Sequence, residues 1–72
     1  MSNLSWIAVS SSSISRIAYV ENDQYLYVEF INGRTCLYKN VPVNEYENLL
    51  RAPSHGKYFS AYIRNVYPFE YV

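Results

Sequence analysis

Asn32-Gly33 separates two short stretches that are rich in apolar and aromatic residues, 25–30 and 35–39. Asn and Gly both tolerate positive φ, so this pair is typical of the turn of a β-hairpin. The two flanking stretches are therefore predicted to be antiparallel strands. Residues 14–20 have a similar composition and are separated from the hairpin by Glu21-Asn22-Asp23, which is typical of a turn. Together these segments predict a three-stranded antiparallel meander.

The register of the hairpin decides which side chains share the buried face, because a slip of one residue moves every side chain to the other face. A two-residue turn pairs Ile31 with Arg34, whereas a three-residue loop with a bulge at Gly33 pairs Phe30 with Arg34. We expect the bulged loop, because it gathers the larger apolar set on one face. That set is Leu26, Val28, Phe30, Cys36 and Tyr38.

Two helical stretches follow, each ended by a proline. Pro42 suits a first helical turn, and Pro53 and Pro68 stop the helices before them. Apolar residues recur at spacings of three and four in both stretches, at Val43, Tyr46, Leu49 and Leu50, and then at Tyr58, Phe59, Tyr62 and Ile63. We therefore predict an α+β fold, with a three-stranded antiparallel β-meander followed by two short helices packed on one face. Within it, Tyr62 is expected in the core and Tyr67 at the surface.

The ends of the chain leave alternatives open. Residues 1–8 are predicted to be an N-terminal arm or an extra strand, and residues 9–72 a single domain. The serine run 10–13 has the composition of a connector, and residues 69–72 are either an extended tail or a short edge strand.

Charge and cysteine content exclude several classes of protein. Six Lys and Arg balance six Asp and Glu, so no polybasic tail is present to bind duplex DNA by charge alone. No stretch approaches the about 18–20 apolar residues of a membrane helix. One cysteine excludes an internal disulfide and a cysteine-based zinc site. Because Met1-Ser2-Asn3 lacks the basic region of a signal peptide, we expect a soluble cytoplasmic domain. We also expect no membrane association, no metal and no cofactor.

Catalysis is not expected. A nucleophile needs a base within hydrogen-bond reach, but Cys36 falls in the middle of a strand and His55 at a helix start. Cys36 is predicted to be a small buried apolar residue. The sequence also has no Gly-rich phosphate loop and no metal-ligand spacing.

A candidate anion or RNA site surrounds the start of the second helix. Ser54 is predicted to cap that helix, where unpaired backbone N–H groups favour anions. Gly56 would let a ligand approach the backbone, and positive charge would come from His55, Lys57 and Arg64, the last two on one helix face. Arg51 lies just before them, and Tyr67 is a candidate for stacking on a base. The alternative is a structural role: a capping serine, a packed glycine and solvated cations.

Two further aromatic residues, Trp6 and Tyr38, are candidates for contacts with a protein partner. Trp6 instead fills part of the core if the N-terminal stretch folds back. The sequence thus supports two kinds of binding module, one for RNA or nucleotide phosphates and one for proteins.

The order of several short motifs resembles the KTSC domain family over about residues 9–71. They are a Ser-Ser pair near the start, Leu26-x-Val28-x-Phe30, Asn32-Gly33, Tyr38, Val41-Pro42, Tyr46, Leu49-Leu50, Ala52, Ser54-x-Gly56-x-Tyr58-Phe59, Ile63-Arg64 and Tyr67. The family's central Tyr-x-Tyr is here Cys36-Leu37-Tyr38, so its first tyrosine is missing. The resemblance implies a stand-alone bacterial or phage protein, or a domain at the C-terminus of a lysyl-tRNA synthetase, and the second context implies RNA binding.

Overall fold

The computed structural model describes residues 4–72 and shows a sheet of five strands with two helices. In chain order the elements are β1 (Ile7–Ala8), β2 (Ile14–Val20), β3 (Tyr25–Phe30), β4 (Thr35–Tyr38), α1 (Val43–Arg51), α2 (His55–Tyr62) and β5 (Phe69–Tyr71). The strands lie in sequence order across the sheet, and every neighbouring pair is antiparallel. The α+β class is thus confirmed.

The prediction of three strands was too low by two. Residues 1–8 were predicted to be an arm or an extra strand; residues 7–8 form the strand β1 beside β2, and residues 1–3 lie outside the described residues. At the other edge, β5 pairs with β4 across Tyr38 and Phe69. Both added strands are very short, and all their residues are exposed, so they carry no alternation of buried and exposed positions.

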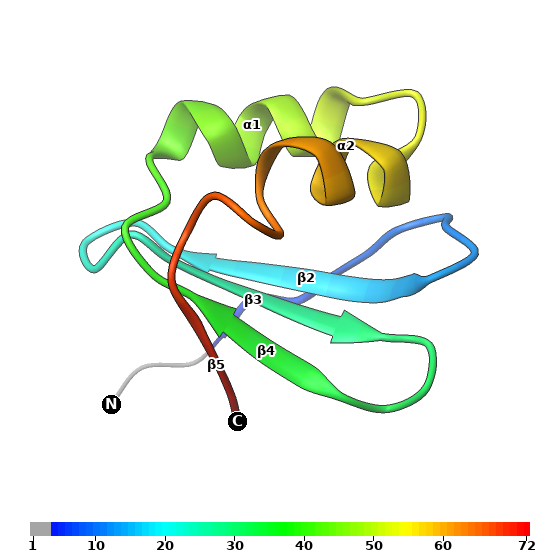
Figure 1. Ribbon diagram of the computed structural model, residues 1–72, viewed down its shortest axis with the longest axis horizontal. Coiled ribbons are helices and arrows are strands. Elements are labelled where there is room, and N and C mark those ends of the chain that lie inside the picture. Colours follow the sequence, from blue (N-terminus) through cyan, green and yellow to red (C-terminus); the bar gives the residue numbers. More distant parts are fainter. Residues whose placement is uncertain (1–3) are drawn as a thin grey trace.

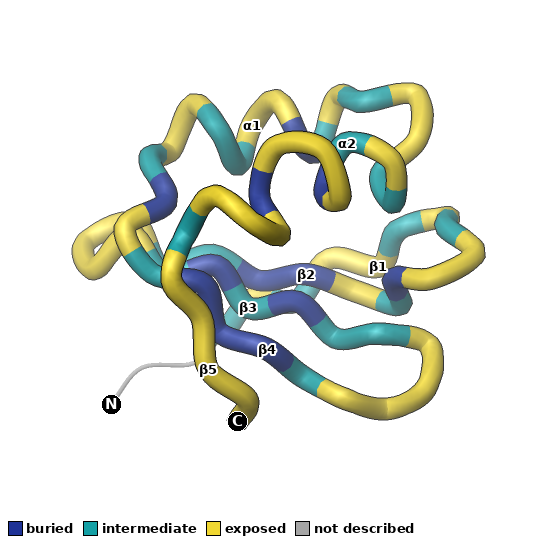
Figure 2. Tube along the Cα trace, in the orientation of Figure 1, coloured by how far each residue is buried: buried dark blue, intermediate teal, exposed yellow. Residues whose placement is uncertain are grey.

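The helices form a second layer over one face of the sheet (Figure 1). They follow β4 in the chain, and β5 then returns the chain to the sheet. Buried residues lie in both layers, as the dark segments of Figure 2 show. Ten buried residues form the core cluster: Ile14, Ile17, Leu26, Val28, Cys36, Tyr38, Val41, Leu49, Phe59 and Ile63.

The bulged register of the β3–β4 hairpin is confirmed. The Phe30 N–H donates to the Arg34 carbonyl oxygen at 2.7 Å, and the Gly33 N–H donates to the Phe30 carbonyl oxygen at 2.9 Å. Gly33 has a φ of 92°, a left-handed conformation that glycine adopts without a steric penalty. Leu26 consequently faces Tyr38, and Val28 faces Cys36.

Val43 is the first residue of α1 and is 37% exposed. Two predicted positions farther along the chain were wrong. Tyr62 was expected in the core but is 56% exposed, because Phe59 and Ile63 fill the space against the sheet. Tyr67 was expected at the surface but is half-buried against the core cluster. None of the described helices is long and apolar enough to cross a membrane.

Candidate phosphate-binding site

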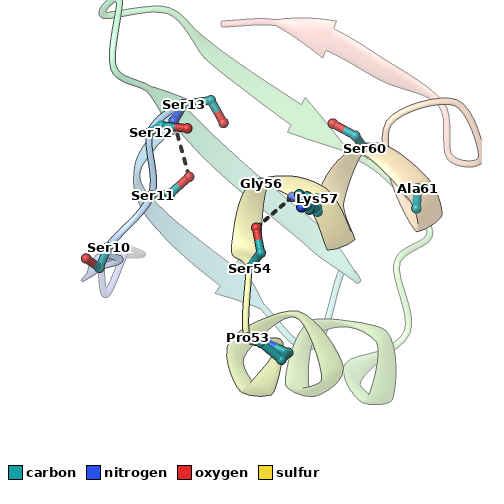
Figure 3. A pocket seen from close by; sticks show the side chains of 10 residues that line it. All are labelled: Ser10, Ser11, Ser12, Ser13, Pro53, Ser54, Gly56, Lys57, Ser60 and Ala61. Carbon is teal, nitrogen blue, oxygen red and sulfur yellow. Dashed lines mark hydrogen bonds between the residues drawn. The ribbon is translucent and has the colours of Figure 1, made fainter.

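The start of α2 lies opposite the loop that joins β1 to β2, and a shallow pocket of about 610 Å³ separates them. Figure 3 shows its walls, with the loop on one side and the first turns of α2 on the other. We call it the serine pocket, because six of the ten residues that line it are serines. The ten are Ser10, Ser11, Ser12, Ser13, Pro53, Ser54, Gly56, Lys57, Ser60 and Ala61.

Ser54 is the N-cap of α2, as predicted, and its hydroxyl accepts a hydrogen bond from the Lys57 N–H at 3.4 Å. Ser54 has an extended backbone, because Pro53 before it ends α1 and a capping residue has non-helical dihedral angles. The N–H groups at the start of a helix have no intrahelical acceptor. No acceptor for those of His55 and Gly56 is found in the described part of the chain, so they are free to bind an anion.

The opposite wall is held in shape by Ser11. Its Oγ accepts hydrogen bonds from the Ser13 N–H at 3.2 Å and from the Ile14 N–H at 3.3 Å. These bonds bend the loop just before β2 begins. Ser12 and Ser13 remain exposed, so their hydroxyls are available to a ligand in the pocket.

The charge around the pocket is one-sided. Lys57 is exposed at its edge, and no carboxylate is among the residues that line it. The helix dipole adds partial positive charge at the same end of α2. Hydroxyl groups, N–H groups and one ammonium group are the kinds of donor that can bind an oxyanion such as phosphate.

A second depression of about 750 Å³ adjoins the serine pocket and shares Ser12, Ser13 and Ser60 with it. We call it the aromatic groove. It contains two further cations, Arg34 and Arg64, and again no carboxylate. All its lining residues are Ser12, Ser13, Phe30, Ile31, Asn32, Arg34, Cys36, Tyr38, Phe59, Ser60, Arg64, Asn65, Phe69 and Tyr71.

The other cations pair elsewhere or lie apart. Arg16 bonds Glu29 with an Nε to Oε1 distance of 2.6 Å, and Lys39 lies 3.5 Å from Glu70. Although the net charge of the chain is zero, the two depressions together hold three cations without an acidic neighbour in their walls.

The structure brings together some of the predicted site residues and separates others. Ser54, Gly56 and Lys57 line the serine pocket, and Arg64 lines the aromatic groove. Lys57 and Arg64 do not share a helix face, because α2 ends at Tyr62 and the chain leaves the helix before Arg64. Arg51 lies at the end of α1 and lines neither depression.

His55 and Tyr67 have contacts outside both depressions. The Nε2 of His55 lies 3.4 Å from the Leu50 carbonyl oxygen, so its ring bridges the two helices, and its buried Nδ1 has no hydrogen-bond partner among residues 4–72. Tyr67 donates its hydroxyl to Glu45 at 3.4 Å. Neither residue therefore lines the pocket that the sequence predicted for it.

The prediction of Tyr38 as an interaction aromatic requires an exposed side chain, but Tyr38 is not a free surface residue. It is only 3% exposed, and its ring meets Phe59 edge-on with a centroid distance of 5.2 Å. Burial raises the pKa of the Tyr38 phenol to about 12, and the Arg64 guanidinium partly opposes this shift. Burial likewise raises the pKa of the neighbouring Cys36 thiol, which is buried as predicted.

Trp6 does fold back, but not into the core cluster. Its ring packs against Tyr27 at a centroid distance of 6.4 Å, and the Arg16 guanidinium lies 4.3 Å from the Trp6 ring centroid. Tyr27 alternates along β3 with the buried Leu26 and Val28, so Trp6 lies on the sheet face away from the helices.

Sequence reasoning missed the serine loop and Arg34 as parts of a site. The sequence predicts only a connector at 10–13 and gives Arg34 a role only in the hairpin register. The one signal in the sequence was the concentration of hydroxyl groups directly before a strand, and their partner, the start of α2, is more than 40 residues away in the chain.

Comparison with known proteins gives a consistent picture. The KTSC domain matches residues 10–67. A lysine–tRNA ligase from Nostoc punctiforme is 36% identical over 59 residues, which are 82% of this chain and 10% of that protein. An uncharacterised protein from Stutzerimonas stutzeri is 37% identical over 54 residues, 75% of this chain and 76% of that protein. The chain thus spans about a tenth of the ligase but three quarters of the smaller relative.

A solved structure has the same fold. The crystal structure of a KTSC domain protein from Yersinia pestis superposes with a TM-score of 0.91 at 28% sequence identity, covering 97% of this chain and 99% of that one.

Proposed function

The chain belongs to the KTSC domain family, and we propose that it is a small non-enzymatic module that binds the phosphates of single-stranded RNA in the serine pocket. The observation that carries the proposal is the meeting of three kinds of anion-binding group in one pocket. These are the hydroxyls of loop 10–13, the start of α2 capped by Ser54, and Lys57.

Single-stranded rather than duplex nucleic acid is favoured by the amount of positive charge. Three cations line the two adjoining depressions, which is enough for a few phosphates but not for the extended backbone of a duplex. One similar protein is a lysine–tRNA ligase, whose name includes an RNA. A non-enzymatic role agrees with the surroundings of Cys36. Its thiol is buried and its pKa is raised by that burial, so it is a thiol rather than a reactive thiolate at neutral pH.

The test is a titration of the ¹⁵N-labelled protein with a six-residue oligouridylate, followed by amide NMR at several salt concentrations. We expect shifts in segments 10–13 and 54–61. If all three cations contact phosphates, the logarithm of the binding constant should fall with the logarithm of salt concentration with a slope of about −2. Shifts scattered over the molecule, or none, would reject the proposal.

A pair of charge reversals provides the control. Lys57→Glu should fold normally, because Lys57 is exposed and its side chain has no ion pair in the described residues, and it should abolish the shifts. Arg51→Glu makes the same change in net charge on an exposed residue outside both depressions and should retain most of the binding. Equal losses in both variants would show that only overall charge matters.

A further inference from the structure

The aromatic groove has two exposed rings at its outer edge, both on β5. Phe69 is 49% exposed and Tyr71 is 63% exposed, although each points to the same side of the sheet as the core residues it pairs with, Tyr38 and Cys36. The helices leave this side of β5 uncovered. Rings in such a place present an apolar face to any ligand that enters the groove.

These rings are held in fixed orientations by their neighbours. Phe69 stacks on the buried Tyr38 with a centroid distance of 5.4 Å and an interplanar angle of 28°. Phe69 and Tyr71 meet edge-on at 5.8 Å and 89°. Rings that are already ordered lose little entropy when a ligand binds, so most of the favourable free energy of stacking contributes to affinity.

Cations accompany the rings. The Arg34 guanidinium carbon lies 5.4 Å from the centroid of the Tyr71 ring, and Arg64 reaches the groove from beyond the end of α2. Rings and guanidinium groups, without a carboxylate in the groove wall, are the combination on which bases of single-stranded nucleic acids stack. The charge in the groove also complements the phosphates on either side of a base.

The groove and the serine pocket are continuous, because Ser12, Ser13 and Ser60 line both. We infer that the aromatic groove is a nucleobase subsite, which holds a base of the same strand whose phosphate occupies the serine pocket. This inference rests on the proposed phosphate site and specifies its ligand: a nucleotide within a single strand, bound through its base as well as its phosphate.

The experiment compares two six-residue probes that carry the same number of phosphates, an oligoadenylate and an abasic oligomer, by NMR titration at low salt. The oligoadenylate should bind about tenfold more tightly, in line with the usual effect of one stacked base. It should also shift the ring protons of Phe69 and Tyr71. Equal affinity for the two probes would overturn the base subsite while leaving the phosphate site intact.

Variants locate the effect. Tyr71→Leu keeps an apolar side chain but removes the ring, and we expect the affinity ratio of the two probes to fall close to one. Tyr62→Leu is the matched control, since Tyr62 is 56% exposed on α2 and lines neither depression, and the ratio should stay near ten. An unchanged ratio in Tyr71→Leu would overturn the inference. If neither probe binds the wild-type protein, the proposed function fails together with it.

Discussion

A Cβ atom on Gly56 would lie 2.9 Å from the Oγ of Ser13 and 3.3 Å from the Oγ of Ser11. The first distance is shorter than real Cβ atoms show, so any side chain at residue 56 requires the Ser13 hydroxyl to move. The positions of the serine hydroxyls that line the pocket therefore depend on this one glycine.

Substitution of Gly56 should show this dependence. Gly56→Val must push Ser11 and Ser13 away, and we expect it to lower the free energy of unfolding by about 1–3 kcal/mol, as overpacked substitutions do. Ala61→Val places the same residue at an exposed position of α2 and should cost less than about 1 kcal/mol. Urea unfolding measures both, and equal losses would mean that the contact with the serine loop is not tight.

Glu45 should stabilise the return of the chain from α2 to the sheet. Its carboxylate accepts hydrogen bonds from the Tyr58 hydroxyl at 2.5 Å and from the Tyr67 hydroxyl at 3.4 Å. Glu45→Gln removes the charge that strengthens both bonds, so the free energy of unfolding should fall by about 1–2 kcal/mol. Glu47→Gln, an exposed change on the same helix, is the control in thermal unfolding. A similar loss in both would assign the effect to the helix dipole.

Tyr19 joins β2 to the chain just before α1. Its ring stacks on Tyr46 with a centroid distance of 4.6 Å, and its hydroxyl donates to the Val41 carbonyl oxygen at 2.5 Å. Tyr19→Phe should lose only the hydrogen bond, about 0.5–1.5 kcal/mol, whereas Tyr19→Leu should lose the stack as well. Chemical unfolding of the two variants separates the contributions, and identical stabilities would argue against the stack.

Alkaline pH should destabilise the fold. Burial raises the pKa of Tyr38 from 10.0 to about 12 and also raises the pKa of Tyr19, Tyr46, Tyr58 and Tyr67. At alkaline pH the folded state thus keeps protons that the unfolded state releases. The contribution of these tyrosines to the free energy of unfolding is therefore fully present below pH 10. The free energy of unfolding should fall as the pH rises from 10.0 towards about 12. A urea midpoint that does not change between pH 9 and pH 11 would contradict this.

The hairpin could be predicted from sequence because its apolar residues alternate, and only the bulged loop at Gly33 collects Cys36 and Tyr38 on the side of Leu26. The edge strands could not be identified with the same certainty. β1 and β5 are held by their neighbours in the sheet rather than by a pattern of their own, since every residue in them is exposed.

The candidate site was only half predictable for a related reason. Ser54, Gly56 and Lys57 could be grouped because they are adjacent in the chain. The serine loop and Arg34 join them only through the packing of α2 over the sheet, which no local pattern encodes. The positions of Tyr62 and Tyr67 are the reverse of the prediction, because helical spacing does not reveal which side chains fill the space against the sheet.

The late return of β5 to the sheet has a consequence for the growing polypeptide. The serine pocket needs only residues 10–61, whereas the aromatic groove also needs Phe69 and Tyr71. Synthesis from the N-terminus therefore supplies every residue that lines the pocket before it supplies β5, and the groove can form only after β5 has paired with β4. A chain that ended before residue 69 would keep all the residues that line the serine pocket and would lack the two rings of the proposed base subsite.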